Sequence, residues 1–387
     1  MPHASSLNQK LSLRIILIAV ALLFLGGWLL LVEQNKSFHP TKINLKLIPA
    51  TTPPSTDSTL STSSGQASSS QASPTSEIRN PKSDIRHLTS DLITEPQDGI
   101  APVLAMIGGA KRSVDLVIYE LSDQKIEQAL ADAQARGLAV RVLLDPGYYG
   151  KPEYYNQAAY DYFSARQIPV HWAPAYFTLT HQKTLIIDQQ AALIMTFNLT
   201  PKYYPTDRDF GVIDEDAADV TEIENNFAAD WNNQKIPNSQ NQNDLIWSPN
   251  AQSKIINLIN SAKTSLQVYN EEMADPAVEQ ALKKAAARKV QVQVVMTDSK
   301  DWQADWQTLT ADQVQVRTYA ADALLYVHAK MIIVDDRQAF VGSQNFSDNS
   351  LNANRELGII TTDPTIVNSL NKTFVADWNG ATLFVSR

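Results

Sequence analysis

The amino-acid sequence predicts an α/β fold that is built twice within one chain of 387 residues. In residues 110–145, an apolar strand pattern is followed by an amphipathic helix pattern and then by a second apolar strand. Residues 262–298 repeat this order at an offset of 152 residues. Because strands that alternate with helices are typical of α/β sheets, we expect a largely parallel or mixed sheet in each of two duplicated domains.

A set of four polar residues recurs in both halves with every internal spacing preserved. The second copy begins 147 residues after the first, and the segments 227–232 and 374–379 keep the same register. The change of offset from 152 to 147 places a net difference of five residues in loops, where such changes are tolerated. The two copies are His181, Lys183, Asp188 and Asn198, and His328, Lys330, Asp335 and Asn345.

The N-terminal region contains a predicted membrane anchor. Residues 15–32 form an apolar stretch whose helical length, about 27 Å, nearly matches a hydrocarbon core of about 30 Å. Lys10 and Arg14 precede this stretch, so we predict a transmembrane signal anchor at 15–32, with residues 1–14 in the cytoplasm and the remainder outside. Secretion after cleavage of a signal peptide is the alternative.

Two further segments are expected to connect folded parts. Residues 33–87 are rich in Ser, Thr and Pro and have few large apolar side chains, so we expect a disordered linker. A polar, turn-rich linker is predicted at residues 237–247. The first domain is then expected at residues 88–236 and the second at 248–387.

Composition limits the chemistry and the partners. The chain has no cysteine, which excludes disulfides, a thiol nucleophile and a thiolate metal site. Its formal net charge is −9, and residues 1–87 hold more basic than acidic residues, so the folded part is more acidic still. Because nucleic acid is bound largely through Lys and Arg, it is a disfavoured partner. No obligate protein partner is predicted.

The histidine and lysine of each tetrad precede a predicted strand. The apolar runs 184–188 and 331–335 follow His-x-Lys in the two halves. Residues at i and i+2 of a strand point to the same face, so each His and Lys should share a pocket. Asp188 and Asp335 complete the predicted catalytic motifs, but they have the opposite parity, and we expect them to point away and to fix the structure.

A second strand in each half ends at a hydroxyl residue and an asparagine. These residues are Thr196 and Asn198 in the first half and Ser343 and Asn345 in the second. Hydroxyl and amide groups, together with the lysines, form a cradle for a phosphate diester. We therefore predict that these four residues bind the substrate.

Paired histidines are suited to a two-step displacement at phosphorus. Histidine serves as nucleophile, acid or base near neutral pH. One histidine would form a phosphohistidine, while the other protonates the leaving oxygen and then activates water or an alcohol. Lysine and asparagine would stabilise the developing charge. This chemistry needs no metal, and no carboxylate cluster in the sequence suggests one, so we predict no cofactor.

Each half contains a segment that resembles one of the paired HKD motifs of the phospholipase D superfamily, namely HQKTLIID and HAKMIIVDD with GSQN. This resemblance, which extends from about Thr89 to the C-terminus, implies two α/β sandwich domains packed as a pseudo-dimer around one active site. It implies that His181 is the nucleophile and His328 the general acid. It also implies that Asp209 and Glu356, eleven positions after the motif asparagines, hydrogen-bond the motif histidines.

The first copy departs from the superfamily pattern. It has Met195-Thr196, where the second copy keeps Gly342-Ser343. Threonine retains the hydroxyl, but methionine in place of glycine is expected to leave less room for a close approach of the backbone. Glu120 and Glu272, which align at strand ends, either line the cleft or are solvated carboxylates.

Together, the resemblance, the anchor and the linker predict a bacterial, membrane-anchored phosphodiesterase of phospholipase D type that hydrolyses or transphosphatidylates phospholipids. Three alternatives remain: an extracellular nuclease with the same site, a cardiolipin-synthase-like transferase, and a binding protein whose site has decayed. Retention of both histidines, both lysines and both asparagines argues against decay.

Overall fold

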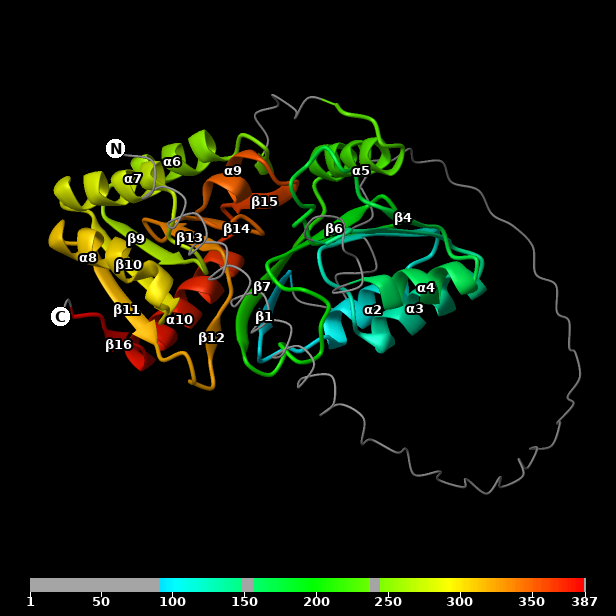
Figure 1. Ribbon diagram of the computed structural model, residues 1–387, viewed down its shortest axis with the longest axis horizontal. Coiled ribbons are helices and arrows are strands. Elements are labelled where there is room, and N and C mark those ends of the chain that lie inside the picture. Colours follow the sequence, from blue (N-terminus) through cyan, green and yellow to red (C-terminus); the bar gives the residue numbers. More distant parts are fainter. Residues whose placement is uncertain (1–90, 148–155, 237–243, 386–387) are drawn as a thin grey trace, which may run out of the picture. The chain divides into compact units, whose positions relative to one another are not determined.

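The computed structural model describes residues 91–147, 156–236 and 244–385 (Figure 1). The predicted cytoplasmic segment, anchor and N-terminal linker lie outside these residues, as does most of the predicted linker at 237–247. Within the described ranges, no helix is long and apolar enough to cross a membrane.

The first half contains a mixed sheet with the strand order β1-β7-β6-β5-β2-β3-β4. Strands β2, β3 and β4 are parallel, whereas β5, β6, β7 and β1 join by antiparallel pairing. The mixed sheet agrees with the sequence-based expectation. Its strands are β1 (Leu92–Glu95), β2 (Ser113–Ile118), β3 (Ala139–Leu144), β4 (Val170–Trp172), β5 (Thr184–Ile187), β6 (Ala191–Met195) and β7 (Asp207–Asp214).

The second half repeats this arrangement in the order β16-β11-β10-β9-β13-β14-β15-β8. Strands β9, β10 and β11 are again parallel and the others pair antiparallel. Strand β8 takes up the last three residues of the predicted linker. The strands are β8 (Leu245–Ser248), β9 (Ser265–Tyr269), β10 (Gln291–Thr297), β11 (Gln315–Tyr319), β13 (Met331–Val334), β14 (Gln338–Gly342), β15 (Glu356–Thr361) and β16 (Thr382–Leu383).

Helices cover both faces of each sheet. In Figure 1, α2, α3 and α4 lie on one face of the first sheet and α5 on the other, and α6, α7 and α8 form the corresponding layer of the second half. The helices are α2 (Ala101–Gly109), α3 (Gln124–Ala135), α4 (Gln157–Ala165), α5 (Ala217–Trp231), α6 (Gln252–Ser261), α7 (Pro276–Ala287), α8 (Gln303–Ala311), α9 (Asp348–Asn352) and α10 (Pro364–Gly380), with a short 3-10 turn η4 (Lys300–Trp302).

The equivalent helices α3 and α7 begin at equivalent aspartates. The Asp123 carboxylate accepts a hydrogen bond from the backbone N–H of Lys125, and the Asp275 carboxylate accepts from the N–H groups of Ala277 and Val278. These bonds satisfy N–H groups that have no partner within the helix. In α7, Pro276 also occupies the first turn, where the missing N–H costs nothing.

Three hydrophobic clusters form the core. The first-half cluster lies between the first sheet and α2–α4, the second-half cluster lies between the second sheet and α6–α9, and the shared cluster joins α5, α10 and the inner faces of both sheets. Strand β5 shows the division, because Leu185 and Ile187 belong to the first-half cluster and Ile186 to the shared one. Burial on both faces explains why the strands are apolar without alternation.

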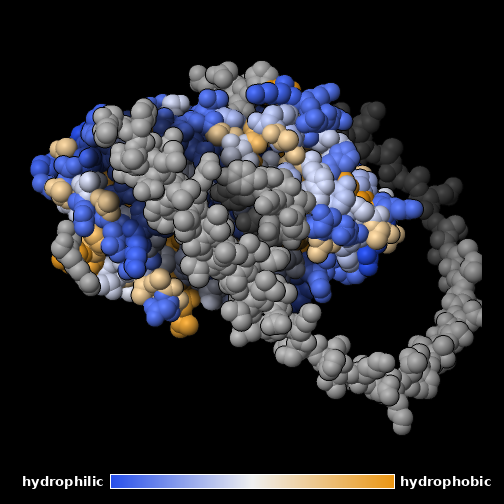
Figure 2. All heavy atoms as spheres, in the orientation of Figure 1, coloured by the Kyte–Doolittle hydropathy of each residue, from blue (hydrophilic) through white to orange (hydrophobic). Residues whose placement is uncertain are grey.

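Hydrophilic residues predominate on the face drawn in Figure 2, where hydrophobic residues form only small groups. Most large apolar side chains of the described residues are instead buried in the three clusters.

The two halves also exchange backbone hydrogen bonds around the predicted motifs. Strand β12 (Tyr326–Val327) belongs to the second half but pairs in parallel with Asp207 and Arg208 of β7. At the equivalent place in the first half, Thr180 forms a parallel bridge with Arg355. The residues directly before each His-x-Lys segment therefore pair with backbone of the other half.

Two buried ion pairs join the halves in the same reciprocal manner. Arg208 Nε lies 2.6 Å from a carboxylate oxygen of Asp377, and Arg355 Nε lies 2.7 Å from one of Asp230. Both arginines and both aspartates are separated by 147 residues in the sequence, and all four side chains are buried. A charge left unpaired at such a place is costly, so these pairs oppose separation of the halves.

Met195 of the first half occupies the place of Gly342 in the second. The Met195 side chain is completely buried in the first-half cluster. A Cβ atom at Gly342 would lie 2.5 Å from the Cα of Gly358 and 2.5 Å from the side-chain oxygen of Gln344, so the second half has no space for a side chain there.

Neighbouring side chains compensate for this difference. Positions 193 and 197 hold Leu and Phe, whereas the equivalent positions 340 and 344 hold Phe and Gln. Phe340 also lies 2.8 Å from the position of a Cβ at Gly342 and fills the space that Met195 takes in the first half. The two strand pairs thus reach a dense core with different side chains.

Replacing Asp230 by Ala should lower the free energy of unfolding by about 3–5 kcal/mol, because Arg355 would lose its buried carboxylate partner. Urea unfolding of the purified protein measures this change. The matched control is Asp312→Ala, which removes the exposed partner of Lys283 and should cost at most about 1 kcal/mol. Equal, small losses in both variants would contradict the role given to the buried pair.

Met195→Ala should lower the free energy of unfolding by about 2–5 kcal/mol, because truncation leaves a cavity in the first-half cluster. The same urea experiment measures it. A loss below about 1 kcal/mol would show that the Met195 side chain is not packed as described.

Candidate active site

The histidine and asparagine of both tetrads line one pocket of about 800 Å³. Its wall combines His181 and Asn198 of the first half with His328 and Asn345 of the second. The size suits a small organic ligand, and the polar groups converge from both halves. Further lining residues that bear on its chemistry are Tyr119, Glu120, Lys202, Tyr203, Asp207, Asp209, Glu271, Glu272, Trp302 and Tyr326.

His181 is held by a carboxylate of the other half. Its Nδ1 lies 3.0 Å from Glu356 Oε2, and because a carboxylate only accepts, Nδ1–H is the donor. The other oxygen of Glu356 accepts hydrogen bonds from the Ser350 hydroxyl, at 2.6 Å, and from the Asn354 amide, at 3.0 Å. These contacts fix the orientation of the imidazole and leave Nε2 free for chemistry.

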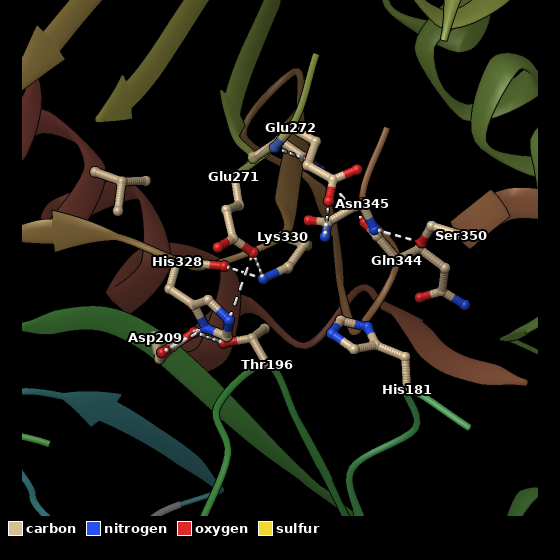
Figure 3. A network of polar contacts seen from close by, with 12 residues as sticks. His181, Thr196, Asp209, Glu271, Glu272, His328, Lys330, Gln344, Asn345 and Ser350 are labelled. Atoms are coloured by element: carbon tan, nitrogen blue, oxygen red, sulfur yellow. Dashed lines mark hydrogen bonds and ion pairs between the residues drawn. The ribbon is translucent and has the colours of Figure 1, made fainter. Parts of the chain in front are cut away.

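His328 is held in the reciprocal way. Its Nδ1 donates to Asp209 of the first half, with distances of 3.0 and 2.9 Å to the two carboxylate oxygens (Figure 3). The resemblance implied that Asp209 and Glu356 hydrogen-bond the motif histidines, and the structure shows both contacts. Each carboxylate serves the histidine of the opposite half.

Burial and charge together set the protonation of His181. Burial lowers the pKa of His181 to about 4, and the nearby charge of Lys183 acts in the same direction. The imidazole is therefore neutral near pH 7. With Nδ1–H directed at Glu356, the Nε2 lone pair is available to act as a nucleophile.

The two motif lysines lie behind the histidines and are buried. Lys183 Nζ donates to the backbone oxygen of His181 at 2.7 Å, and Lys330 Nζ donates to that of His328. Burial, followed by repulsion from Lys330, lowers the pKa of Lys183 to about 7. Each lysine thus places a positive charge next to its own histidine.

The two asparagines were predicted to bind substrate, and both line the pocket. Their side-chain oxygens are buried and have no hydrogen-bond partner among the described residues. The Asn345 amide nitrogen donates to Glu272 at 3.1 Å. An unpartnered buried oxygen in a pocket wall can accept a hydrogen bond from a bound hydroxyl group.

Thr196 and Ser343 were also predicted to bind substrate, but neither lines the pocket. The Thr196 hydroxyl donates to Asp209 and accepts from the backbone N–H of Phe210 at 2.8 Å. The Ser343 hydroxyl donates to the backbone oxygen of Leu357 and accepts from the backbone N–H of the same residue. Both hydroxyls therefore support the strands and carboxylates around the site, and neither lies on the pocket wall.

Asp188 and Asp335 lie at the far ends of β5 and β13 and do not line the pocket. The Asp188 carboxylate accepts from the backbone N–H groups of Lys111, Arg112 and Ser113. Asp335 accepts from the equivalent N–H groups of residues 263–265. Their place within the predicted catalytic motifs is therefore structural, because they fix the turn before β2 and β9.

Met195 is absent from the pocket wall as well, because its side chain packs in the first-half cluster. The Met195 side chain therefore occupies core volume and does not narrow the pocket. Glu120 and Glu272, for which the sequence left two possibilities, do line the pocket. Burial raises the pKa of both carboxyl groups above the ordinary value.

One pocket residue, Glu271, was missed by the sequence analysis. Its carboxylate contacts Lys330 Nζ at 2.9 Å and lies 3.5 Å from His328 Nε2 (Figure 3). At the offset of 152 residues, its equivalent is Tyr119, so the repeat does not mark this position. The repeat indicates only the adjacent pair, Glu120 and Glu272.

A carboxylate–histidine cluster that the sequence did not predict lies beside this site. Potential ligand atoms of Asp207, Asp209 and His328 all lie within 4.8 Å of one another. The Asp209 oxygens already accept hydrogen bonds from His328 and Thr196, and Asp207 accepts one from Thr206. These hydrogen bonds account for the arrangement, and three donors are fewer than a closed metal site uses.

Solved structures with a similar fold include two enzymes of phosphate chemistry. Phosphatidylserine synthase of Haemophilus influenzae superposes with a TM-score of 0.60 at 13% identity, over 77% of this chain and 88% of that one. Polyphosphate kinase of Porphyromonas gingivalis gives a TM-score of 0.59 at 14% identity, over 74% of this chain and 47% of that one. At these identities the likeness concerns the fold alone.

Sequence comparison gives a narrower result. The major cardiolipin synthase of Bacillus subtilis (strain 168) is 25% identical over 342 residues, which are 77% of this chain and 69% of that protein. A phospholipase D of Rickettsia conorii is 28% identical over 153 residues, 38% of this chain and 70% of its own length. The family profile described as "Cardiolipin synthase, PLD-like domain" matches residues 103–231 and 255–378. The chain therefore belongs to the phospholipase D superfamily, in the family of cardiolipin synthase, PLD-like domains.

Proposed function

We propose that the protein is a phosphodiesterase that transfers the phosphatidyl group of a phospholipid to an alcohol or to water through a phosphohistidine. The observation that carries this proposal is the pair of histidines in one pocket, each with Nδ1 held by a carboxylate of the opposite half. Because Nδ1 of each ring is engaged, the chemistry falls to the Nε2 atoms of the two rings.

In the first step, neutral His181 attacks phosphorus through Nε2. The bond from phosphorus to the leaving alcohol breaks, and protonated His328 gives its Nε2 proton to the leaving oxygen. In the second step, neutral His328 removes a proton from water or an alcohol, whose oxygen attacks phosphorus. The phosphorus–nitrogen bond then breaks and His181 is restored, while Lys183 stabilises the charge on the phosphoryl oxygens.

Two observations favour an alcohol as acceptor. The curated relatives that match most of this chain are named cardiolipin synthases. In addition, the unpartnered oxygens of Asn198 and Asn345 are suited to accept hydrogen bonds from hydroxyl groups. Transfer to an alcohol such as a glycerol headgroup is therefore our preferred reaction, with hydrolysis as the second.

The charge of the pocket wall favours a lipid over nucleic acid. Five carboxylates, those of Glu120, Asp207, Asp209, Glu271 and Glu272, line the pocket, whereas Lys202 is the basic residue on its described wall apart from the histidines. A polyanion would meet repulsion on either side of the reacting phosphate. A phospholipid presents one phosphodiester and an uncharged or cationic alcohol.

The cellular place of the enzyme is part of the proposal and rests on the sequence. An anchor at residues 15–32 and a linker at 33–87 would hold the catalytic domains outside the cytoplasm and within reach of the lipid surface. Release after cleavage of a signal peptide is the alternative.

His181→Ala and His328→Ala should each lower the release of headgroup from phosphatidylglycerol vesicles by about 10⁴-fold or more, because each removes an essential group of one mechanism. The matched control, His171→Ala, changes a histidine that stacks on Trp231 away from the pocket and should retain activity. Single-stranded DNA is assayed in parallel, with and without chelator.

Cleavage of DNA but not of lipid would reject the lipid proposal, and a folded wild-type protein without any turnover would favour the decayed binding protein. Substantial activity in either active-site variant would reject the shared pocket. Loss of wild-type turnover in chelator would reject a reaction without metal.

The pH dependence of kcat/KM should be bell-shaped. His181 is neutral, and so nucleophilic, only above its pKa of about 4, and Lys183 is charged only below its pKa of about 7. Activity should therefore rise through about pH 4 and fall through about pH 7. Initial rates at low substrate concentration measure the profile. A plateau that continues to pH 9 would contradict the part assigned to Lys183.

A further inference from the structure

The two halves of the pocket differ at one position next to the reacting histidines. Glu271 follows β9 in the second half, and its equivalent after β2 in the first half is Tyr119. The sequence around them is otherwise repeated, since Glu120 corresponds to Glu272 and both line the pocket. A carboxylate thus stands at only one of two equivalent places.

Glu271 makes three contacts within the second-half motif. One carboxylate oxygen accepts from Lys330 Nζ at 2.9 Å and lies 3.5 Å from His328 Nε2 (Figure 3). The other accepts from the Tyr326 hydroxyl at 3.1 Å. Burial would raise the pKa of Glu271, but the charges of Lys330 and His328 outweigh it and hold this pKa well below its ordinary value. The group is therefore a permanent anion.

Tyr119 gives the first-half motif a different surrounding. Its ring packs edge-on against His181 at 4.7 Å between centroids, and Lys183 Nζ lies 5.0 Å from the ring centre. The ring brings no full negative charge to either group. Among the described residues, Lys183 has no ion pair with a carboxylate, whereas Lys330 is paired with Glu271.

The ring of His328 accordingly lies between two carboxylates, Asp209 at Nδ1 and Glu271 at Nε2. The other charged or titratable groups that face it are Lys330 behind the ring, Asp207 on β7, Glu120 after β2, and His181 and Lys183 of the first-half motif. The ring of His181 has one carboxylate contact, Glu356 at Nδ1. The ring of His328 is therefore in contact with two carboxylates, and the ring of His181 with one.

We propose that Glu271 is a positioning residue that keeps His328 protonated and directed at the leaving or entering oxygen, so that the second half supplies the acid and the first half the nucleophile. The inference rests on the proposed function. Glu271 itself neither gives nor takes a proton. The proton of His328 Nε2 passes to the leaving oxygen and returns from the acceptor alcohol or water, with Glu271 as the fixed countercharge.

The test compares two phosphodiesters that differ in their need for an acid. Phosphatidylglycerol releases a poor leaving alcohol, whereas bis(p-nitrophenyl) phosphate releases a phenolate that needs little protonation. Glu271→Gln should lower kcat/KM for phosphatidylglycerol by about tenfold or more and change that for the nitrophenyl diester by less than about threefold. Glu271→Asp, which keeps the charge, should recover part of the loss.

The matched control is Asp301→Asn. The Asp301 carboxylate lies in the neighbouring surface hollow and itself has no contact with His328. This variant should leave both reactions unchanged. Circular dichroism and the urea midpoint verify that each variant is folded. An equal loss with both substrates in folded Glu271→Gln would overturn the proposal, because it would indicate a general disturbance of the pocket.

A second measurement does not depend on turnover. In protein labelled with ¹⁵N-histidine, the signals of His328, assigned by their loss in His328→Ala, report the pH at which its imidazole gives up a proton. That pH should fall in Glu271→Gln and stay in place in Asp301→Asn. An unchanged value in Glu271→Gln would overturn the proposal, whereas wild-type protein inactive on both diesters would refute the proposed function instead.

Discussion

Reciprocal pairing between the halves is the constraint on which the rest of this structure depends. Each reacting histidine and each buried arginine finds its anionic partner in the opposite half, and equivalent pairs are related by the 147-residue repeat. A half folded alone would expose the shared cluster and leave these charges without their partners, which is costly for buried groups. Folding of the pair and assembly of the site are therefore one event.

Duplication also explains how two equal motifs came to differ. The same strand ends carry the same histidines and lysines, while neighbouring positions are free to change if packing and charge remain balanced. Met195 and Gly342 differ in volume, and the neighbouring core side chains differ in size so that both cores stay densely packed. This difference in packing does not change the pocket wall. Tyr119 and Glu271 differ in charge beside the reacting nitrogens, where no compensation occurs and where the chemistry of the two halves separates.

Burial increases the effect of these small differences on the protonation of the site. The motif lysines and histidines have little exposure, so each added carboxylate or removed charge alters protonation more than it would at the surface. Burial lowers the pKa of both His181 and Lys183, whereas Glu271 provides a local anion for Lys330. One acidic pocket can in this way hold a neutral nucleophile and a charged acid.

By itself, the sequence determined the two α/β halves, the mixed sheets and the eight motif residues, because strand and helix periodicity and a conserved spacing are local properties of a chain. It also indicated that Asp188 and Asp335 have the opposite parity to the lysines. Only the tertiary structure decided that Asp209 and Glu356 hydrogen-bond the histidines of the opposite half. It also decided that the hydroxyls of Thr196 and Ser343 bond to neighbouring groups behind the pocket wall, and that Glu271 lies beside His328. The reason is physical: spacing fixes which way a side chain leaves its own strand, but its partner is set by how two sheets pack, which no local pattern records.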